Sequence, residues 1–369
     1  MDKKRILIIA DSMNGGGAER VLLTLLPHLT ASYEVTLLFY HLIGPLVGQL
    51  PQNVKVLSLY HPKGKTIFEK ILFHTPWRHA YERRGLHRLV GQDDFHAIVS
   101  WLEGPAAVLH SHLLHRPCRH VTWVHIDMQA FPWSTRFFPS AKAEKEFYAT
   151  VRRIVFVSLQ AQSHFPYRVA TPMQVIYNLV DTDRIQTLSR ERCPVTREGF
   201  TLCFVGRLTA VKRLDRVLQA VAIVRRRGYD VHLWMVGEGE DRENVTRNIG
   251  KLNLDSCVKL TGFTQNPYPY MRECDALVLG SDAEGLPTVI LEALCLGTPV
   301  VATRTAGTVQ LLGQGGGLLA DFTPQSMADA IERIITEPGL ATRLRQEALS
   351  VASRRNDDEI LGQIKELLG

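Results

Sequence analysis

The chain has 369 residues, of which 45% are hydrophobic and 22% charged. This composition is typical of a folded globular protein and excludes a disordered, collagen-like or disulfide-stapled chain, while the length favours two domains. No apolar run approaches the roughly 20 residues of a membrane-spanning helix, and the apolar stretch 6–10 is too short for a signal peptide. The six cysteines are dispersed without a C-x-x-C pair, so we expect reduced thiols and a cytoplasmic protein.

The net charge of +6 is unevenly distributed along the chain. Residues 1–179 carry 20 lysines and arginines against 12 acidic residues, whereas residues 180–369 carry 23 against 25. A basic first half indicates an anionic partner, such as lipid headgroups, an anionic glycan or nucleic acid. A basic surface that only contacts solvent explains the imbalance equally well.

Short apolar runs, most of them buried on both faces, alternate with helical patterns along the whole chain. Parallel strands covered by helices have this signature, so the pattern predicts a doubly wound α/β fold. Helical spacing of apolar residues marks 21–29, 214–224 and 359–368. The expected strands are 5–10, 34–40, 54–59, 97–102, 120–124, 152–158, 201–205, 231–236, 258–261, 276–279 and 299–302.

The series of strands and helices occurs twice. We therefore expect a first domain over residues 1–170, a connection over 171–199 that holds Pro172 and Pro194, and a second domain over 200–358. The two Rossmann-like domains should face a cleft. The last helix, 359–369, has one apolar face and should pack against another part of the chain.

Segment 63–92 is rich in cations and carries interleaved apolar side chains such as Phe68, Phe73 and Trp77. Basic residues beside aromatic ones suit an amphipathic segment on an anionic membrane. An ordinary surface helix with extended cationic side chains is the alternative.

A glycine-rich turn follows the first strand: Asn14-Gly-Gly-Gly-Ala-Glu-Arg20. Glycines at a helix start allow backbone N–H groups to approach an anion, so Gly16 and Gly17 are candidate phosphate contacts. The dinucleotide fingerprint is not met, because Arg20 stands where a third small residue is needed. A tight packing turn explains the glycines nearly as well.

Two cations follow the first strand of the second domain. Arg207 and Lys212 lie in Gly206-Arg-Leu-Thr-Ala-Val-Lys-Arg213, at the carboxyl end of a strand, where ligands bind in doubly wound sheets. Both can converge on one diphosphate. They can also be two ordinary surface cations.

The most specific pattern is Glu284-Gly-Leu-Pro-Thr-Val-Ile-Leu-Glu292. Pro287 suits the first turn of a helix, which places Glu284 in the preceding loop and Glu292 inside the helix. Carboxylates accept pairs of hydrogen bonds from the hydroxyls of sugars. A phosphate could be bound by backbone N–H groups at this helix start, from Gly285, Leu286 and the residues that follow, such as Thr288. An acid that complements the helix dipole and a solvated mid-helix glutamate form the alternative.

Several histidines and aspartates raise the question of a metal site. Asp181-Thr-Asp183 resembles a D-x-D motif, but it lies away from the candidate diphosphate contacts. His112 and His115 show no ligand spacing with a carboxylate, so we expect no metal site. His125 differs, because it directly follows a strand and precedes Phe131 and Trp133, aromatic residues that suit sugar stacking.

These motifs resemble the group 1 retaining glycosyltransferases of GT-B fold, among them enzymes of lipopolysaccharide-core and surface-polysaccharide synthesis. The resemblance covers nearly the whole chain and rests on GGAERV, GRLTAVKRLD, IYNLVDTDRI and EGLPTVILEALCLGTPVVAT. One departure is Gln310, which stands where the family often has a glutamate.

The resemblance implies roles for the candidate residues. Gly16 and Gly17 would face the donor diphosphate, and Arg207 and Lys212 would neutralise it as it leaves. Glu284 would bind sugar hydroxyls and Glu292 the nucleotide ribose. Gly285, Leu286, Pro287 and Thr288 would line the donor subsite. His125 would lie near the donor sugar and the acceptor. The last helix, 359–369, would cross back and pack on the first domain.

The expected activity is transfer of a hexose or N-acetylhexosamine, with retention, from a nucleotide-diphosphate sugar to a hydroxyl. We prefer a UDP-sugar donor and a lipid-linked or cell-surface glycan acceptor such as lipopolysaccharide core. We expect no metal, no other cofactor and no nucleic acid, and a cytoplasmic protein that contacts the inner face of the membrane. The alternatives are a sugar-nucleotide epimerase on the same fold and a non-catalytic protein that binds anionic membranes or nucleic acid.

Overall fold

The computed structural model describes residues 3–60, 75 and 77–369, which form two compact units. The first unit comprises Met1–Leu179 together with Asp357–Gly369, and the second comprises Val180–Asn356. The boundary falls inside the segment 171–199 to which the sequence analysis assigned a connection. Each unit has its own sheet and its own covering helices.

The first unit holds a seven-stranded parallel sheet in the order β3-β2-β1-β4-β5-β6-β7. Its strands are β1 Lys4–Ala10, β2 Tyr33–His41, β3 Lys55–Tyr60, β4 Ala97–Ser100, β5 Arg119–Val124, β6 Arg153–Phe156 and β7 Met173–Val175. Its helices are α1 Gly17–Ser32, α3 Arg78–Val90, α4 Pro105–Ser111, α5 Ala141–Thr150, α6 Leu159–Ser163 and α15 Asp357–Leu368, with short 3-10 turns at Val47–Gln49 and Ser134–Arg136.

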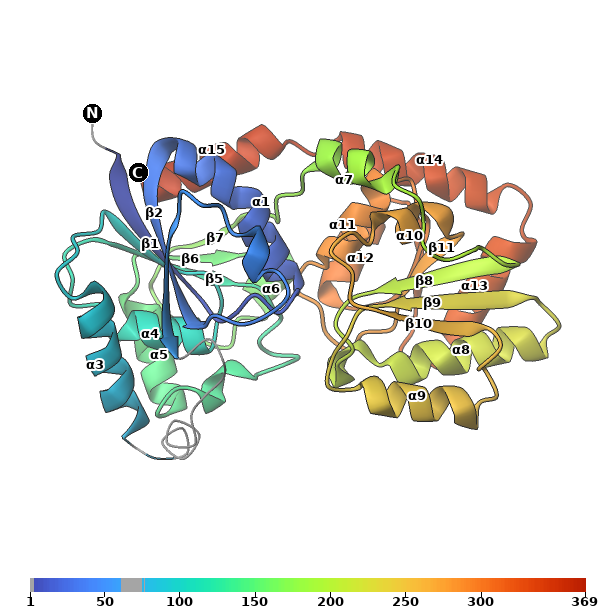
Figure 1. Cartoon of the computed structure of the whole chain (residues 1–369), viewed down its shortest axis with the longest axis horizontal. Helices are drawn as coiled ribbons and strands as arrows, with labels where there is room; N and C mark the ends of the chain where they lie inside the picture. Colours follow the sequence, from blue (N-terminus) through green and yellow to red (C-terminus); the bar gives the residue numbers. More distant parts are fainter. Residues whose placement is uncertain (1–2, 61–74, 76) are drawn as a thin grey trace. The chain divides into compact units, whose positions relative to one another are not determined.

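Helices cover both faces of this sheet, as the apolar runs predicted. Figure 1 shows α1 on one side and α3 and α4 on the other. Leu7 and Ile98 on the strands pack with Leu86 of α3 and Leu109 of α4 in one buried cluster. Since these strand residues are fully excluded from solvent, the sheet forms the centre of the unit.

Helix α15 returns to the first unit, as the sequence predicted. Its end lies beside the starts of β1 and β5, where the Lys4 ammonium donates to the Gly369 carbonyl oxygen. The Tyr33 hydroxyl donates to the Lys365 carbonyl oxygen at 3.4 Å. Ile360, Ile364 and Leu368 form the buried face of the helix. The two chain ends therefore lie side by side (Figure 1).

The second unit holds a six-stranded parallel sheet in the order β10-β9-β8-β11-β12-β13. Its strands are β8 Phe200–Val205, β9 Val231–Val236, β10 Val258–Gly262, β11 Ala276–Leu279, β12 Val300–Thr303 and β13 Gly317–Ala320. Its helices are α7 Thr182–Ser189, α8 Leu214–Arg226, α9 Arg242–Lys251, α10 Tyr268–Glu273, α11 Thr288–Cys295, α12 Ala306–Leu312, α13 Pro324–Thr336 and α14 Leu340–Ser353, with a 3-10 turn at Ala210–Lys212.

Two strands were missed by the sequence analysis. Strand β7 has three half-buried residues, and β13 opens on Gly317 and is only partly buried. Both are edge strands of only three and four residues, too short to give a recognisable apolar run. The segment 171–199 is therefore not a structureless connection: β7 completes the first sheet and α7 packs on α10 and α11.

Only part of the basic segment 63–92 can be compared with the prediction, because 63–74 and 76 lie outside the described residues. The remainder is helix α3, which buries Arg78, Glu82 and Leu86 and exposes the arginines at 83, 84 and 88. Trp77, directly before the helix, is 73% exposed. Among the described residues, no helix combines the length and the hydropathy needed to cross a membrane.

Candidate functional site

The second unit gathers the predicted donor residues at one edge of its sheet. Strands β8 and β11 are hydrogen-bonded neighbours, and both run toward that edge. From β8 the chain crosses to β9 on one side, while β11 lies on the other, so the strand order reverses between them. Ligands of doubly wound sheets bind outside the carboxyl ends of the strands at such a point. Residues 206–212 follow β8, and residues 280–287 follow β11.

Lys212 and Glu284 meet at this edge. The Lys212 ammonium donates to Glu284 Oε1 at 2.6 Å, and the side chains are 21% and 11% exposed. The Ser281 hydroxyl donates to the same oxygen at 2.6 Å. An ammonium has three N–H donors, so Lys212 can hold Glu284 and still contact a second anion. The pair thus places a cation that can bind a diphosphate next to a carboxylate that can accept hydrogen bonds from sugar hydroxyls.

Two arginines hold the loop that carries Glu284. Arg213 has a left-handed backbone (φ 46°) and pairs with Asp282 at 3.1 Å. The buried Arg216 pairs with Asp282 at 2.8 Å and also donates to the Gly280 carbonyl oxygen. The start of α8 is therefore cross-linked to the loop after β11, which fixes where the Glu284 carboxylate lies.

Arg207 lies in the same loop as Lys212 but is exposed. It forms no ion pair with any of the residues that the structure describes, so its guanidinium is accessible to an anionic ligand. Its loop packs closely on the next one: a Cβ on Gly237 would lie 1.9 Å from the Gly206 carbonyl oxygen. This contact explains Gly237-Glu-Gly239 as a packing turn.

Helix α11 begins directly after the Glu284 loop. Pro287 is its N-cap, and Leu286 and Thr288 are buried. The Gly307 N–H donates to the Glu284 carbonyl oxygen at 3.3 Å, and a Cβ on Gly307 would lie 2.5 Å from the Gly285 carbonyl oxygen. The start of α12 therefore supports the loop 284–287. The first N–H groups of α11 have no acceptor within their own helix and can bind an anion.

Glu292 lies inside α11 rather than at the surface. It is 5% exposed and accepts a hydrogen bond from the Tyr268 hydroxyl at 3.3 Å. The sequence analysis missed Tyr268, as it missed Ser281, Arg213 and Arg216. The contact of Ser281 with Glu284 lies within one loop and spans three residues. The contacts of Arg213, Arg216 and Tyr268 join segments that are separate in the chain, so the local sequence does not indicate them.

The first unit brings Gly16, Gly17 and His125 to one edge of its own sheet. Trp101, which follows β4, donates from its indole N–H to the Ala18 carbonyl oxygen at 2.8 Å. Its ring lies 5.1 Å from the His125 ring. Since β4 is the strand between β1 and β5, Trp101 connects the start of α1 with His125.

The glycine turn has an acidic neighbour within its own helix. Gly16 is the N-cap of α1, and a Cβ on it would lie 2.4 Å from the Glu19 carboxylate, which is buried. A negative charge therefore already lies at this helix start. An anion that contacts Gly16 and Gly17 would therefore bind close to the Glu19 carboxylate, which has the same sign of charge.

His125 is held by its surroundings in a neutral form. Burial lowers the pKa of His125 to about 3, against a smaller opposing effect of a hydrogen bond to the Trp101 backbone. Its backbone N–H donates to the buried Glu103 carboxylate at 2.9 Å, and Trp133 donates to the same group at 3.0 Å. The ring atom Nε2 is buried without a hydrogen-bond partner among the described residues.

Asp181 has a structural role in the described part of the chain. Its carboxylate caps α7 by accepting the Arg184 N–H at 2.9 Å. Asp181 is therefore the N-cap residue of α7.

Two models of known protein families match this chain. The family model described as glycosyl transferases group 1 matches residues 187–351, and the model described as glycosyltransferase family 4 matches residues 15–184. The lipopolysaccharide core biosynthesis glycosyltransferase LpsE of Rhizobium meliloti is 31% identical over 47% of this chain and 51% of that protein. The matched stretch thus spans about half the length of this curated relative.

Solved structures match over the whole length. The Anabaena protein HepE in complex with UDP-glucose has a TM-score of 0.77 at 21% identity and covers 99% of each chain. WaaG, a glycosyltransferase involved in lipopolysaccharide biosynthesis, has a TM-score of 0.77 at 15% identity and covers 98% of this chain and 99% of that one.

The fold is therefore GT-B, with two Rossmann-like domains, as the sequence predicted. The chain belongs to the group 1 glycosyltransferases: one half matches their group 1 domain and the other half a family 4 domain.

Proposed function

We propose that this protein transfers a hexose or N-acetylhexosamine, with retention of configuration, from a UDP-sugar to a hydroxyl of a lipid-linked or cell-surface glycan. The observation that carries the proposal is the Lys212–Glu284 pair at 2.6 Å beside the accessible Arg207. It combines cations for a leaving diphosphate with a carboxylate for sugar hydroxyls, at the edge of the sheet where ligands bind.

In this reaction the second unit binds the donor. Arg207 and Lys212 contact the diphosphate, and the N–H groups at the start of α11 complement its charge. Negative charge grows on the leaving phosphate while the sugar gains oxocarbenium character. Fixed cations that already point at that charge lower the barrier without reorganisation. The bracing by Arg213 and Arg216 supports this preorganisation. In the proposed reaction Arg207 and Lys212 supply the positive charge that a divalent metal would otherwise supply.

Glu284 and Glu292 act as hydrogen-bond acceptors. Glu284 takes the donor sugar hydroxyls, and Glu292 takes the ribose, for which its contact with Tyr268 must open or be shared. We assign no covalent nucleophile. The acceptor hydroxyl gives its proton to the departing phosphate oxygen, so the chain needs no separate general base.

His125 is the first unit's contribution. Since its pKa of about 3 keeps the ring neutral near pH 7, it acts as a hydrogen-bonding group rather than as a cation. The buried Nε2 has no partner among the described residues and is suited to a sugar hydroxyl.

The acceptor and the nucleotide base are supported by the relatives. HepE was solved with UDP-glucose, and LpsE and WaaG are named for lipopolysaccharide synthesis. The exposed Trp77 and the arginines of α3 suit peripheral contact with an anionic membrane, which would bring a lipid-linked acceptor to the first unit.

Calorimetric titration with UDP and GDP tests the donor assignment. We expect UDP to bind the wild-type protein, and Lys212→Ala and Arg207→Ala each to weaken it about 10- to 100-fold. Arg333→Ala, which removes an exposed cation paired with Glu337 on α13, is the matched control and should bind UDP normally. A folded wild-type protein that binds neither nucleotide would sink the proposal.

Product analysis separates the rival functions. Incubation with UDP-sugars should release UDP and form a glycoside only when an acceptor is present. Conversion of one UDP-sugar into its epimer would identify an epimerase instead. Binding to anionic vesicles that is unchanged by Lys212→Ala, with no nucleotide binding by either protein, would identify a non-catalytic membrane protein.

A further inference from the structure

A buried cluster of possible metal ligands lies in the first unit, outside the residues discussed so far. His79 and Glu82 are three residues apart on α3 and so project from the same face. His112 is the C-cap residue of α4. One ligand atom from each of the three side chains lies within 4.8 Å of the other two.

The spacing of these atoms suits a small ion. Neighbouring ligands on a tetrahedral Zn²⁺, with bonds of about 2.0–2.2 Å, are roughly 3.3–3.6 Å apart. His79 Nδ1 lies 3.3 Å from Glu82 Oε2, inside this range. His112 Nε2 lies 3.9 Å from the same oxygen, so this ring must move inward by a few tenths of an ångström to ligate the same ion. All three atoms are buried, and none has a well-formed hydrogen bond to any residue that the structure describes.

The Glu82 carboxylate is fully buried and is held in place by two donors. Its Oε1 accepts from the Arg78 guanidinium at 2.7 Å and from the Tyr40 hydroxyl at 3.1 Å. Such contacts orient the ligating carboxylate and leave Oε2 facing the histidines.

The set favours one class of ion. Two imidazole nitrogens and one carboxylate oxygen match the ligands of Zn²⁺ and its neighbours, whereas Mg²⁺ and Ca²⁺ prefer oxygen ligands alone. Arg78 opposes a cation here, since it already balances the Glu82 charge. The competing arrangement is a proton shared between the histidines and Glu82. That arrangement would be expected to form the hydrogen bonds that the geometry lacks.

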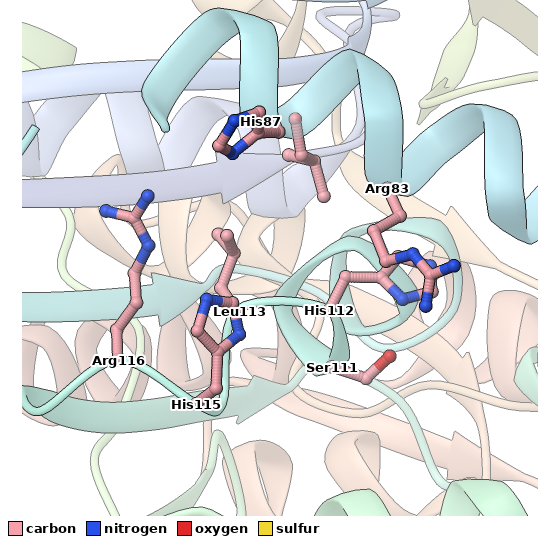
Figure 2. A pocket seen from close by; sticks show the side chains of 8 residues that line it. Arg83, His87, Ser111, His112, Leu113, His115 and Arg116 are labelled. Atoms are coloured by element: carbon pink, nitrogen blue, oxygen red, sulfur yellow. The ribbon is translucent and has the colours of Figure 1, made fainter. Parts of the chain in front are cut away.

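A cavity lies beside the cluster. A cavity of about 450 Å³ is lined by Arg83, His87, His112 and His115 together with the loop that follows α4. Figure 2 shows the His112 ring beside Arg83 under helix α3. His112 therefore belongs both to the cavity wall and to the buried cluster.

We propose that His79, Glu82 and His112 bind one divalent transition-metal ion, Zn²⁺ by preference, which ties helix α3 to the end of α4. The ion would be structural, since its ligands are separate from the Arg207, Lys212 and Glu284 cluster of the other unit. This inference is independent of the donor chemistry proposed above.

Metal binding is measured directly on the full chain. The protein is stripped with a chelator, and Zn²⁺ is then titrated in competition with a chromophoric chelator. We expect one equivalent to bind, and His79→Asn and His112→Asn each to weaken binding at least tenfold. His87→Asn and His115→Asn, which alter cavity histidines outside the cluster, are matched controls and should bind as the wild type does.

Cobalt gives a second readout that does not depend on the stability of a variant. Co²⁺ bound to the wild-type protein should show the visible absorption bands of four- or five-coordination, and Zn²⁺ should displace it. The proposal fails if the folded wild-type protein binds neither ion at about 100 μM. It also fails if His79→Asn and His112→Asn leave binding unchanged, or if His115→Asn abolishes it.

Discussion

The coupling between Lys212 and Glu284 is the most informative energetic test of the second unit. A charge-assisted hydrogen bond in a partly buried site contributes about 1.5–3 kcal/mol. Lys212→Met removes the cation and leaves the Ser281 hydroxyl as a donor to Glu284, which should cost about 2–3 kcal/mol. Glu284→Gln retains a neutral acceptor for both donors and should cost about 1 kcal/mol.

A double-mutant cycle isolates the interaction itself. If the pair is coupled, the double variant should be more stable than the sum of the single effects by about 1–2 kcal/mol. In thermal unfolding, each kcal/mol corresponds to about 2–4 °C for a domain of this size. Coupling below about 0.5 kcal/mol would show that the 2.6 Å contact contributes no specific stability and would refute the reasoning.

Nucleotide titrations on the same variants separate the two roles. Lys212→Met should weaken UDP about 10- to 100-fold, because the ammonium is assigned to the diphosphate. Glu284→Gln should leave UDP affinity within about threefold but remove any additional affinity of a UDP-sugar over UDP. Equal loss of UDP affinity in both variants would contradict the division of labour between cation and carboxylate.

Three further predictions concern packing and protonation. Gly307→Ala places a Cβ 2.5 Å from the Gly285 carbonyl oxygen, so it should destabilise the second unit by about 1–3 kcal/mol and weaken UDP binding, as unfolding and calorimetry would show. Tyr268→Phe removes one hydrogen bond to Glu292 and should lower the free energy of unfolding in urea by about 1 kcal/mol. An unchanged free energy of unfolding would contradict this prediction. His110, fully buried, has its pKa lowered by burial and by His120, so the unfolded chain alone takes up its proton below pH ~6.5. Stability should fall as the pH decreases, and His110→Gln should reduce the loss between pH 7 and 5.5 by about 1 kcal/mol; parallel urea titrations that show equal losses in both proteins would contradict this.

Most of the architecture could be predicted from the sequence because buried parallel strands have continuous apolar runs. Strands β9 and β11 have the predicted bounds, and β1 and β8 differ by one residue at one end. Strands β7 and β13 were missed, since they have only three and four residues and lie partly exposed at a sheet edge, so they give no recognisable apolar run. The return of α15 was predicted from its apolar face together with the family resemblance.

The sequence by itself determined the class of residues in the site and the elements that carry them. The strand-to-loop positions of Arg207, Lys212 and Glu284 follow from local patterns, because the carboxyl ends of parallel strands meet at one edge of a sheet. The glycine turn and His125 follow the ends of β1 and β5 in the same way.

Only the tertiary structure decided which side chains meet. The bracing of Asp282 by Arg213 and Arg216, the contact of Tyr268 with Glu292 and the joining of His79, Glu82 and His112 all link segments separated in the chain. Local sequence patterns describe backbone conformation and burial, which depend on neighbouring residues. Hydrogen bonds and ligand sets depend on side-chain positions to within a few tenths of an ångström, and those are fixed by packing between elements.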